Sequence, residues 1–308
     1  MSAAGEHEGE ADRRQPEPPG RLLVLGGAGM LGGAVVAAAR ARRLPCVGLD
    51  REQVDLCDTP ALERALDDSR PDVVINCAAF TDVDGCEQRV EHALEVNGRA
   101  VGRLAQAVAV RGAVLFQVST DYVFRGDTDR PYREDDETDP ASVYGESKLL
   151  GERLALERGR AVVVRTSWLF GPGGRNFVDT IVRTARAGGP LRVVDDQVGC
   201  PTYAPFLASA LIELAERTLV AGSPPPPSVL HYRNGEPVSW CSFARAALEC
   251  WGLDAPIEPV TTEEFPRPAR RPAYSVLCVE RFERLMGRGV PDWREALCDY
   301  RHLEGARV

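Results

Sequence analysis

The sequence contains no long basic block and no long apolar run. Aspartate and glutamate number 46 against 37 lysines and arginines, which gives the 308-residue chain a net charge of −9. This balance argues against nucleic acid or an anionic membrane surface as the main partner. No apolar stretch reaches the roughly 18 residues that a membrane-spanning helix needs. We therefore expect a chain that binds neither nucleic acid nor a membrane.

Paired cysteines and metal-binding patterns are also missing. The nine cysteines include no Cys-x-x-Cys pair, and the four histidines show no metal-ligand spacing. An odd number of scattered cysteines, several of them beside apolar runs, is typical of buried free thiols in a reducing cytoplasm. Residues 1–20 lack the basic start and the apolar core of a signal peptide. We expect them to form a disordered leader on a cytoplasmic protein that holds no metal.

From Arg21 onward, short apolar runs alternate with amphipathic segments. Residues 22–25 form a continuous apolar run that ends in glycines, which is typical of a strand buried on both faces. The pattern predicts further strands at 47–50, 72–77, 113–118 and 161–165, and helices at 30–42, 59–69, 90–111 and 142–158. Thr59 is expected to cap the second helix, with Pro60 at its first position. This alternation predicts an α/β fold of the Rossmann type, with a doubly wound parallel sheet covered on both sides.

Beyond Arg165 the alternation loosens. Further strands are predicted at 191–194 and 229–232, and further helices at 176–187, 204–220, 239–251 and from 293 onward. We expect the C-terminal third to form a smaller lobe that partly shares strands with the main sheet.

A glycine-rich turn joins the first strand to the first helix. Gly26, Gly29 and Gly32 recur at three-residue intervals. Such a turn needs backbone freedom, and a pyrophosphate needs close approach to the N–H groups at the start of the helix. This spacing is that of short-chain dehydrogenases rather than that of larger dehydrogenases. The turn therefore predicts a dinucleotide cofactor, with Met30 and Leu31 among its neighbours.

The residues after the second strand leave the choice of cofactor open. Asp50 stands at the strand end, where a carboxylate can accept hydrogen bonds from the adenosine ribose and so favour NADH. Arg51 follows directly and could pair with the 2′-phosphate of NADPH. Five further residues are predicted to line the cofactor: Asp55 and Leu56 under the adenine, and Ala78, Ala79 and Phe80 past the ribose and the nicotinamide.

Tyr144 and Lys148 are the candidate catalytic pair. Their four-residue spacing places a phenol and an ammonium on one face of a helix. A nearby lysine favours the phenolate and lowers the pKa of tyrosine, so that the phenol can donate and recover a proton. Thr120 ends the fourth strand, where ligands bind in parallel sheets. Its hydroxyl could hydrogen-bond a substrate oxygen whose charge changes during hydride transfer.

Longer runs of sequence give these residues a family context. The chain resembles the extended short-chain dehydrogenases/reductases and, within that superfamily, the dTDP-4-dehydrorhamnose reductase family. The runs that carry the resemblance include GGAGMLGG (26–33), STDYVFRG (119–126), VYGESKLLGE (143–152), VRTSWLFG (164–171), DDQVGCPTY (195–203) and RRPAYS (270–275).

The resemblance implies roles for several residues. Tyr144 would donate the proton, while Lys148 would bind the nicotinamide ribose and tune Tyr144. Thr120, Asp121 and Trp168 would contact the sugar nucleotide. Trp168 follows the fifth strand, where an indole can pack on a sugar face or, alternatively, fill the core between the lobes.

Arg271 is a further candidate for the substrate site. Its guanidinium could offset phosphate charges by bidentate hydrogen bonds. The alternative is that Arg271 belongs to a solvated basic loop.

The implied activity is reduction of the 4-keto group of dTDP-4-dehydrorhamnose by NADPH or NADH. The implied domains are a NAD(P)-binding domain at 21–166, with contributions from about 190–232, and a substrate-binding lobe at 167–189 and 233–308. Three alternatives stay open: reduction of another nucleotide-linked 4-keto-deoxysugar, epimerisation, and a non-catalytic regulatory role like that of the NADP-binding subunit of methionine adenosyltransferase. Tyr122 stands where sugar-nucleotide dehydratases carry an acid, which argues against elimination of water.

Four positions depart from the family pattern. Phe80 replaces a polar residue, and Tyr274 stands where asparagine is frequent. Some relatives dimerise through a metal held by acidic side chains, but Ala34 and Pro205 occupy those positions here. We therefore expect no metal, and the chain could be a monomer or a homodimer.

Overall fold

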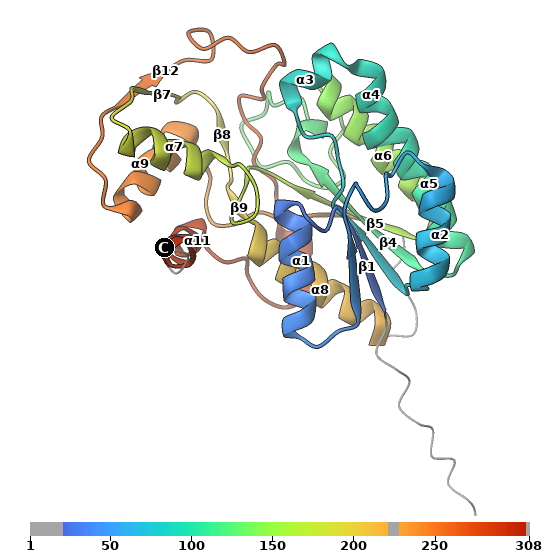
Figure 1. Cartoon of the computed structure of the whole chain (residues 1–308). Coiled ribbons are helices and arrows are strands. Elements are labelled where there is room, and N and C mark those ends of the chain that lie inside the picture. The colour runs from blue at the N-terminus through green and yellow to red at the C-terminus, as the bar shows by residue number, and fades with distance from the viewer. Residues whose placement is uncertain (1–20, 221–227, 306–308) are drawn as a thin grey trace, which may run out of the picture.

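A six-stranded parallel sheet forms the centre of the structure. The computed structural model describes residues 21–220 and 228–305 (Figure 1), so the predicted leader at 1–20 lies outside the described residues. The strand order is β10-β5-β4-β3-β1-β2, and every neighbouring pair is parallel. The strands are β1 (Leu22–Leu25), β2 (Cys46–Leu49), β3 (Val73–Asn76), β4 (Val114–Thr120), β5 (Ala161–Thr166) and β10 (Ser228–His231). This order confirms the predicted Rossmann-type sheet.

Helices cover both faces of this sheet (Figure 1). One face carries α1 (Met30–Ala41) and α8 (Ala204–Val220), and the other carries α2 (Thr59–Ser69), α5 (Ala100–Val110) and α6 (Val143–Arg158). The strands between them are mostly apolar because neither face meets water, and their polar residues, such as Asn76, Thr120 and Thr166, lie toward their carboxyl ends. The exception is β2, an edge strand whose Val47 is 45% exposed.

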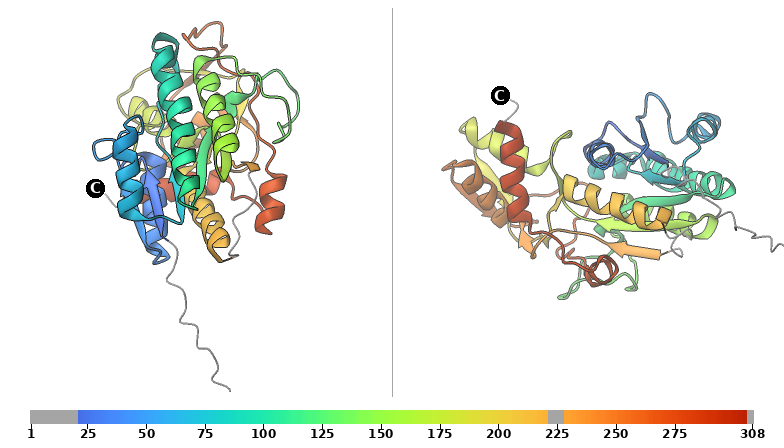
Figure 2. Two further views of the ribbon diagram at one scale, coloured as in Figure 1. Left: turned by 90° about the vertical axis from the view of Figure 1, so that its right-hand side faces the viewer. Right: turned by 90° about the horizontal axis from the view of Figure 1, so that it is seen from below.

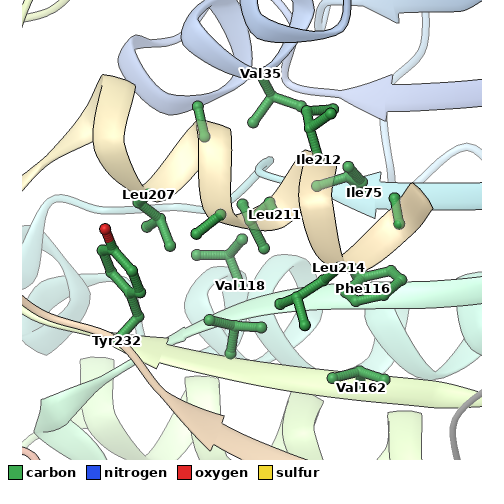
Figure 3. Close-up of a cluster of buried hydrophobic side chains, with 14 of the residues drawn as sticks. Val35, Ile75, Phe116, Val118, Val162, Leu207, Leu211, Ile212, Leu214 and Tyr232 are labelled. Atoms are coloured by element: carbon green, nitrogen blue, oxygen red, sulfur yellow. The ribbon is translucent and has the colours of Figure 1, made fainter. Parts of the chain in front are cut away.

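The core under α1 and α8 fixes the sheet (Figure 3). Side chains from α8 interlock with Ile75 of β3, Phe116 and Val118 of β4, and Val162 of β5. Val35 joins them from α1. Burying one such side chain contributes about 1.5–3 kcal/mol. This packing fixes the positions of the strands and therefore also the positions of their carboxyl ends.

Two predictions about the helices were wrong in detail. The N-cap of α2 is Asp58 and not Thr59, because the Asp58 carboxylate accepts a hydrogen bond of 3.0 Å from the Ala61 N–H. The predicted helix at 90–111 consists of α4 (Val90–Leu94), a π-helical turn at Glu95–Arg99, and α5. Two helices were not predicted: α3 (Val83–Gln88) and α10 (Glu280–Met286).

Many of the remaining elements gather on one side of the molecule (Figure 2). They comprise α7 (Phe177–Arg186), α9 (Trp240–Trp251), α11 (Trp293–Gly305) and three pairs of short strands: β6 (Leu169–Phe170) with β9 (Thr202–Tyr203), β7 (Leu191–Val194) with β12 (Ile257–Val260), and β8 (Val198–Gly199) with β11 (Val238–Ser239). An aromatic core that includes Phe170, Phe243 and Trp293 holds this smaller lobe together. Among the elements within 190–232, β10 is a strand of the main sheet and α8 packs against that sheet. The strand β7 instead pairs with β12 outside the main sheet.

Within the described residues, no helix combines the length and the apolar character that crossing a membrane requires. All nine cysteines fall in this part of the chain and are free thiols. Four of these cysteines, which lie beside apolar runs in the sequence, differ in burial: Cys200 is buried, while Cys46, Cys57 and Cys77 are half-buried.

Candidate active site at the carboxyl end of the sheet

The glycine turn leaves the start of α1 open to an anion. Gly26 has a φ of +76°, and a Cβ there would lie 2.8 Å from the Ala78 nitrogen. A Cβ on Gly32 would lie 2.1 Å from the Gly26 oxygen, so neither position tolerates a side chain. Gly29 is the N-cap of α1, which has no side-chain cap and no acidic residue in its first turn. The backbone N–H groups at this helix start therefore favour a negatively charged group.

Two of the predicted cofactor neighbours serve mainly as core residues. The side chains of Leu31 and Leu56 are each 6% exposed and belong to the hydrophobic cores on the two faces of the sheet. Met30 is half-buried and lies against the loop that follows β6, where a Cβ on Gly174 would be 3.1 Å from the Met30 Cβ. The smaller lobe thus reaches the glycine turn.

The carboxylate of Asp50 organises the turn after β2. It accepts hydrogen bonds from the Glu52 N–H at 2.9 Å and the Gln53 N–H at 3.0 Å. The Arg51 side chain is 76% exposed and pairs with Asp55 at 3.4 Å. The Cys57 N–H lowers the pKa of Asp55, although burial opposes this effect. Asp50 and Arg51 both lie in this exposed turn, so the geometry is compatible with NADH and with NADPH.

An asparagine that carries no role in the sequence prediction anchors the segment after β3. Asn97 lies in the π-helical turn and is 1% exposed. Its Oδ1 accepts from the Phe80 N–H at 2.8 Å, and its Nδ2 donates to the Phe80 oxygen and to Ser147 Oγ, both at 3.0 Å. The ring of Phe80 packs against His92 and the Arg89 guanidinium. Asn97 therefore ties residues 78–80 to α6, and π-helical turns frequently mark such sites.

The end of β4 carries a buried hydroxyl beside a buried carboxyl. Thr120 Oγ1 donates to Asp121 Oδ1 at 3.0 Å and accepts from the Tyr122 N–H at 3.2 Å. Asp121 is 2% exposed, and its Oδ2 has no hydrogen-bond partner among the described residues. Burial raises the pKa of Asp121 to about 6, against the lowering effects of the Ser275 and Thr120 hydroxyls. The Ser275 hydroxyl therefore lies near the Asp121 carboxyl, although it does not complete a hydrogen bond to Asp121 Oδ2.

Tyr144 faces these groups from α6. The helix begins at Ser142, whose Oγ accepts from the Gly145 N–H at 3.2 Å. A Cβ on Gly145 would lie 2.2 Å from the Tyr122 oxygen, so this glycine lets α6 approach the strand end. The Thr120 side chain lies close enough to the Tyr144 phenol to act on its pKa, which it lowers. Burial, followed by the nearby Asp121 carboxyl, raises the pKa of Tyr144 well above its usual value.

Lys148 reaches from α6 to the backbone of β4. Its Nζ donates to the Val118 oxygen at 2.8 Å, and the side chain is buried. Desolvation lowers the pKa of Lys148 to about 8, although the Glu152 carboxylate opposes this shift. Burial raises the pKa of Tyr144, and Lys148 is not among the main groups that act on it, so the tuning of Tyr144 by Lys148 stays a prediction. Lys148 is also the single lysine of the chain, all other cationic side chains besides histidine being arginine.

Trp168 has an aromatic partner that the sequence did not reveal. Its ring stacks on Trp240, with centroids 3.5 Å apart and planes 9° apart. A Cβ on Gly199 would lie 2.6 Å from Trp168 Cε2, so the glycine backbone also lies against the indole. Trp168 has a φ of +45°, which is uncommon for a bulky residue and persists only where the surroundings enforce it. The two tryptophans form a wall at the junction of the sheet and the smaller lobe.

Arg271 is not a solvated loop residue. It donates to Asp84 at 3.1 Å, and its side chain is only 15% exposed. Arg267 pairs with the other Asp84 oxygen at 2.8 Å. Burial acts to raise the pKa of Asp84, but the Ala269 N–H and the two guanidiniums hold it below its usual range. Asp84 was missed by the sequence prediction, since nothing near it in the sequence indicates its distant partners.

The comparisons with known proteins agree on one family. The family described as "RmlD substrate binding domain" matches residues 20–303. The dTDP-4-dehydrorhamnose reductase of Streptomyces griseus is 41% identical over 92% of this chain and 94% of its own length. The chain belongs to the dTDP-4-dehydrorhamnose reductase family. The resemblance predicted from the sequence is thus confirmed.

Other relatives of this family extend the comparison. The spore coat polysaccharide biosynthesis protein SpsK of Bacillus subtilis is 39% identical over 91% of this chain and 96% of its own length. A crystal structure of dTDP-4-dehydrorhamnose reductase from Bacillus anthracis in complex with NADP superimposes with a TM-score of 0.85. It is 32% identical and covers 92% of this chain and 98% of that one.

Proposed function

We propose that the protein reduces the 4-keto group of dTDP-4-dehydrorhamnose to give dTDP-L-rhamnose, with NADPH or NADH as the reductant. The observation that carries this proposal is the close packing of the start of α6, which carries Tyr144, against the carboxyl end of β4, where Thr120 lies. Ligands of parallel sheets bind at this edge, and a ketone reductase needs a proton donor there. The reductases that share about 40% of the sequence over the whole domain support the choice of substrate.

The residues of the glycine turn fit a dinucleotide. Gly26 and Gly32 permit close approach, and the uncapped start of α1 would hold the pyrophosphate. Asn97 would fix residues 78–80 beside the ribose. Bound NAD(P)H supplies the hydride. NADP in the Bacillus anthracis relative favours testing NADPH first, with the exposed Arg51 as the candidate partner of the 2′-phosphate.

The roles at the reacting carbonyl follow from the protonation states. The raised pKa of Tyr144 keeps its hydroxyl protonated at neutral pH, so it can donate to the carbonyl oxygen as hydride arrives at the carbon. Thr120 would hydrogen-bond the same oxygen. Lys148, held by the Val118 carbonyl, would bind the nicotinamide ribose.

The smaller lobe would hold the sugar nucleotide. The Trp168–Trp240 wall would border the sugar, and Arg271, oriented by Asp84, would contact the diphosphate. We accordingly propose that residues 21–166, together with α8 and β10, bind the cofactor, while most of the rest binds the substrate. We also propose a monomer or homodimer that acts in the cytoplasm, where nine free thiols would stay reduced.

The test follows nicotinamide absorbance with purified dTDP-4-dehydro-L-rhamnose and NADPH or NADH in parallel. We expect net oxidation of the cofactor and dTDP-L-rhamnose as the product. Oxidation only with a different 4-keto-deoxysugar would reassign the substrate, and redox-neutral conversion would indicate an epimerase. No oxidation with any keto-sugar, together with co-purification of a methionine adenosyltransferase, would indicate a regulatory subunit.

A further inference from the structure

A buried ion pair joins α6 to the main sheet. Glu152 of α6 accepts from Arg165 of β5 with both carboxylate oxygens: Arg165 Nε lies 3.0 Å from Oε1, and Nη2 lies 2.7 Å from Oε2. The arginine side chain is 5% exposed and the glutamate side chain 2%. Among the described residues, Glu152 has no other side-chain partner. A buried ion pair gains little stability over apolar side chains of the same volume, so its presence here calls for another explanation.

The guanidinium of Arg165 is held in place from several sides. Its Nη1 lies 3.3 Å from His231 Nε2, and His231 Nδ1 lies 3.2 Å from the Tyr132 oxygen. The carbonyl can only accept, so Nδ1 carries the proton and Nε2 can accept from Arg165. Burial and the Arg165 charge lower the pKa of His231 to about 3, which keeps the ring neutral. The ring of Phe124 covers the guanidinium at 5.0 Å. Arg165 therefore cannot leave Glu152 without losing these contacts.

Lys148 lies one helical turn before Glu152 on the same face of α6. Side chains four residues apart on a helix are close enough for a lysine and a glutamate to pair. These two form no ion pair, because Lys148 Nζ instead donates to the Val118 oxygen of β4 at 2.8 Å. The lysine is 4% exposed and makes no other hydrogen bond within the part of the chain that the structure describes. The carboxylate on its own helix face is thus occupied by Arg165, and the ammonium stays at the strand.

We propose that Arg165 is a positioning residue that withholds Glu152 from Lys148 and so keeps the ammonium at the carboxyl end of β4. The inference rests on the proposed role of Lys148 in binding the nicotinamide ribose, and it adds the residue on which that role depends. Without the guanidinium, Glu152 would be a buried carboxylate with no partner. An unpaired buried charge is costly, so the ammonium one turn away would move from the Val118 oxygen to Glu152.

The groups around Lys148 give its titration a direction. Burial lowers the pKa of Lys148 to about 8, and the Glu152 carboxylate raises it against this effect. The other ionisable group that faces the lysine is the Cys77 thiol after β3, whose pKa burial raises to about 12, so it stays neutral. Two substitutions that break the same ion pair should therefore act in opposite directions. R165M frees the Glu152 charge and raises the pKa of Lys148, whereas E152Q removes that charge and lowers it.

The titration can be read directly, because Lys148 is the single lysine of the chain. Protein labelled with 15N in the lysine side chain gives one Nζ resonance, which is followed against pH without cofactor or substrate. We expect the midpoint to rise in R165M, to fall in E152Q, and to return close to the wild-type value in R165M/E152Q. Shifts of the same sign in both single variants, or no shift, would overturn the proposal, whatever the enzyme reduces.

Binding of NADPH tests whether the ammonium moves. We expect the Kd for NADPH to rise by at least ~10-fold in R165M, the scale of losing one charged hydrogen bond. E152Q breaks the same ion pair but leaves no carboxylate to capture Lys148, so its Kd should stay within about threefold of the wild type, as should that of R165M/E152Q. An ion pair that only stabilises the fold would lower the melting temperature of both single variants and change neither Kd, and this result would overturn the proposal.

A milder variant covers the case in which R165M does not fold, since removing one partner of a buried ion pair is strongly destabilising. The amide of R165Q can still donate one hydrogen bond to Glu152, so we expect the same changes at a smaller size. An unchanged midpoint and an unchanged Kd in R165Q would contradict the proposal. A wild-type protein that binds no NADPH would instead count against the proposed function, because the Lys148 titration does not depend on the cofactor.

Discussion

The proposed site has two ends that differ in how their charges are compensated. We call the end at β4 and α6, with Asp121 and Lys148, the inner end, and the end at Asp84 and Arg271 the outer end. At the inner end Asp121 and Lys148 are buried, and neither forms an ion pair among the described residues. At the outer end Asp84 binds both Arg267 and Arg271. Burial therefore shifts each inner group toward its neutral form, whereas pairing keeps each outer group charged. The inner end is suited to moving protons and the outer end to binding an anionic nucleotide.

The largest expected effect comes from removing the inner hydroxyl. Tyr144→Phe deletes the proton donor but keeps the ring, which packs 5.5 Å from Tyr122. We expect turnover to fall by at least ~100-fold, the usual scale of general acid catalysis, while the Kd for NADPH stays within threefold. Steady-state rates and fluorescence titration of NADPH measure the two quantities. A variant with near-wild-type turnover would remove Tyr144 from the mechanism.

Removing an outer charge is expected to weaken binding and spare the chemistry. Arg271→Met should raise the Kd for dTDP by about 10- to 100-fold, because a charged hydrogen bond contributes roughly 1.5–3 kcal/mol. Turnover at saturating substrate should change little. Arg270→Met is the matched control, since Arg270 is the exposed neighbour and makes no ion pair in the described part of the chain. Equal losses from both variants would indicate a general effect of charge.

The Trp168–Trp240 wall is a third part of the proposed site. Trp240→Leu removes the ring that stacks on Trp168 and leaves an apolar side chain in its place. We expect the KM for the keto-sugar to rise about 10-fold, because Trp168 loses the contact that holds its left-handed backbone in place. The Kd for NADPH should be unchanged, and calorimetric titration would measure it. A variant with an unchanged KM would show that the stack only fills space.

The smallest expected effects concern how the free energy of unfolding depends on pH. These effects have opposite signs at the inner and outer ends. The pKa of Asp121 is raised to about 6, so the folded state binds its proton more tightly and stability falls as the pH rises from about 4 to 6. The slope is at most about 1.4 kcal/mol per pH unit. The pKa of Asp84 is lowered, so its contribution is present above its usual pKa and is lost as the pH falls below about 4.

Urea unfolding between pH 3 and 7 separates these contributions. D121N should lack the loss between pH 4 and 6, and D84N should lack the loss at lower pH. Identical pH profiles for the wild type and both variants would contradict the described balance of charges.

The sequence predicted the main sheet well because most of its strands are buried on both faces and therefore begin with continuous apolar runs. It predicted β7, whose exposure alternates, but missed its partner β12, which is mostly exposed and contains a proline. It missed the π-helical turn because the apolar spacing of 90–111 fits an uninterrupted helix. It placed Thr120, Tyr144 and Lys148 near one another through their strand-end and helical positions.

Other features of the site depend on contacts between distant residues. The Arg271–Asp84 bond joins residues 187 positions apart. The partner of Trp168 likewise comes from α9, far along the chain. The four-residue spacing predicted that Tyr144 and Lys148 share a helix face, but the raised pKa of Tyr144 depends on its burial, which the spacing does not encode. Desolvation is a property of the folded chain and is absent from a local motif.

The most direct measurement of the proposed reduction uses NADPH deuterated at the transferable position of the nicotinamide. The enzyme is incubated with dTDP-4-dehydro-L-rhamnose, and the product is analysed by nuclear magnetic resonance. We expect dTDP-L-rhamnose with one deuterium at C4 and one NADPH oxidised per sugar. Product without deuterium at C4, or no oxidation of the cofactor, would contradict hydride transfer at this site.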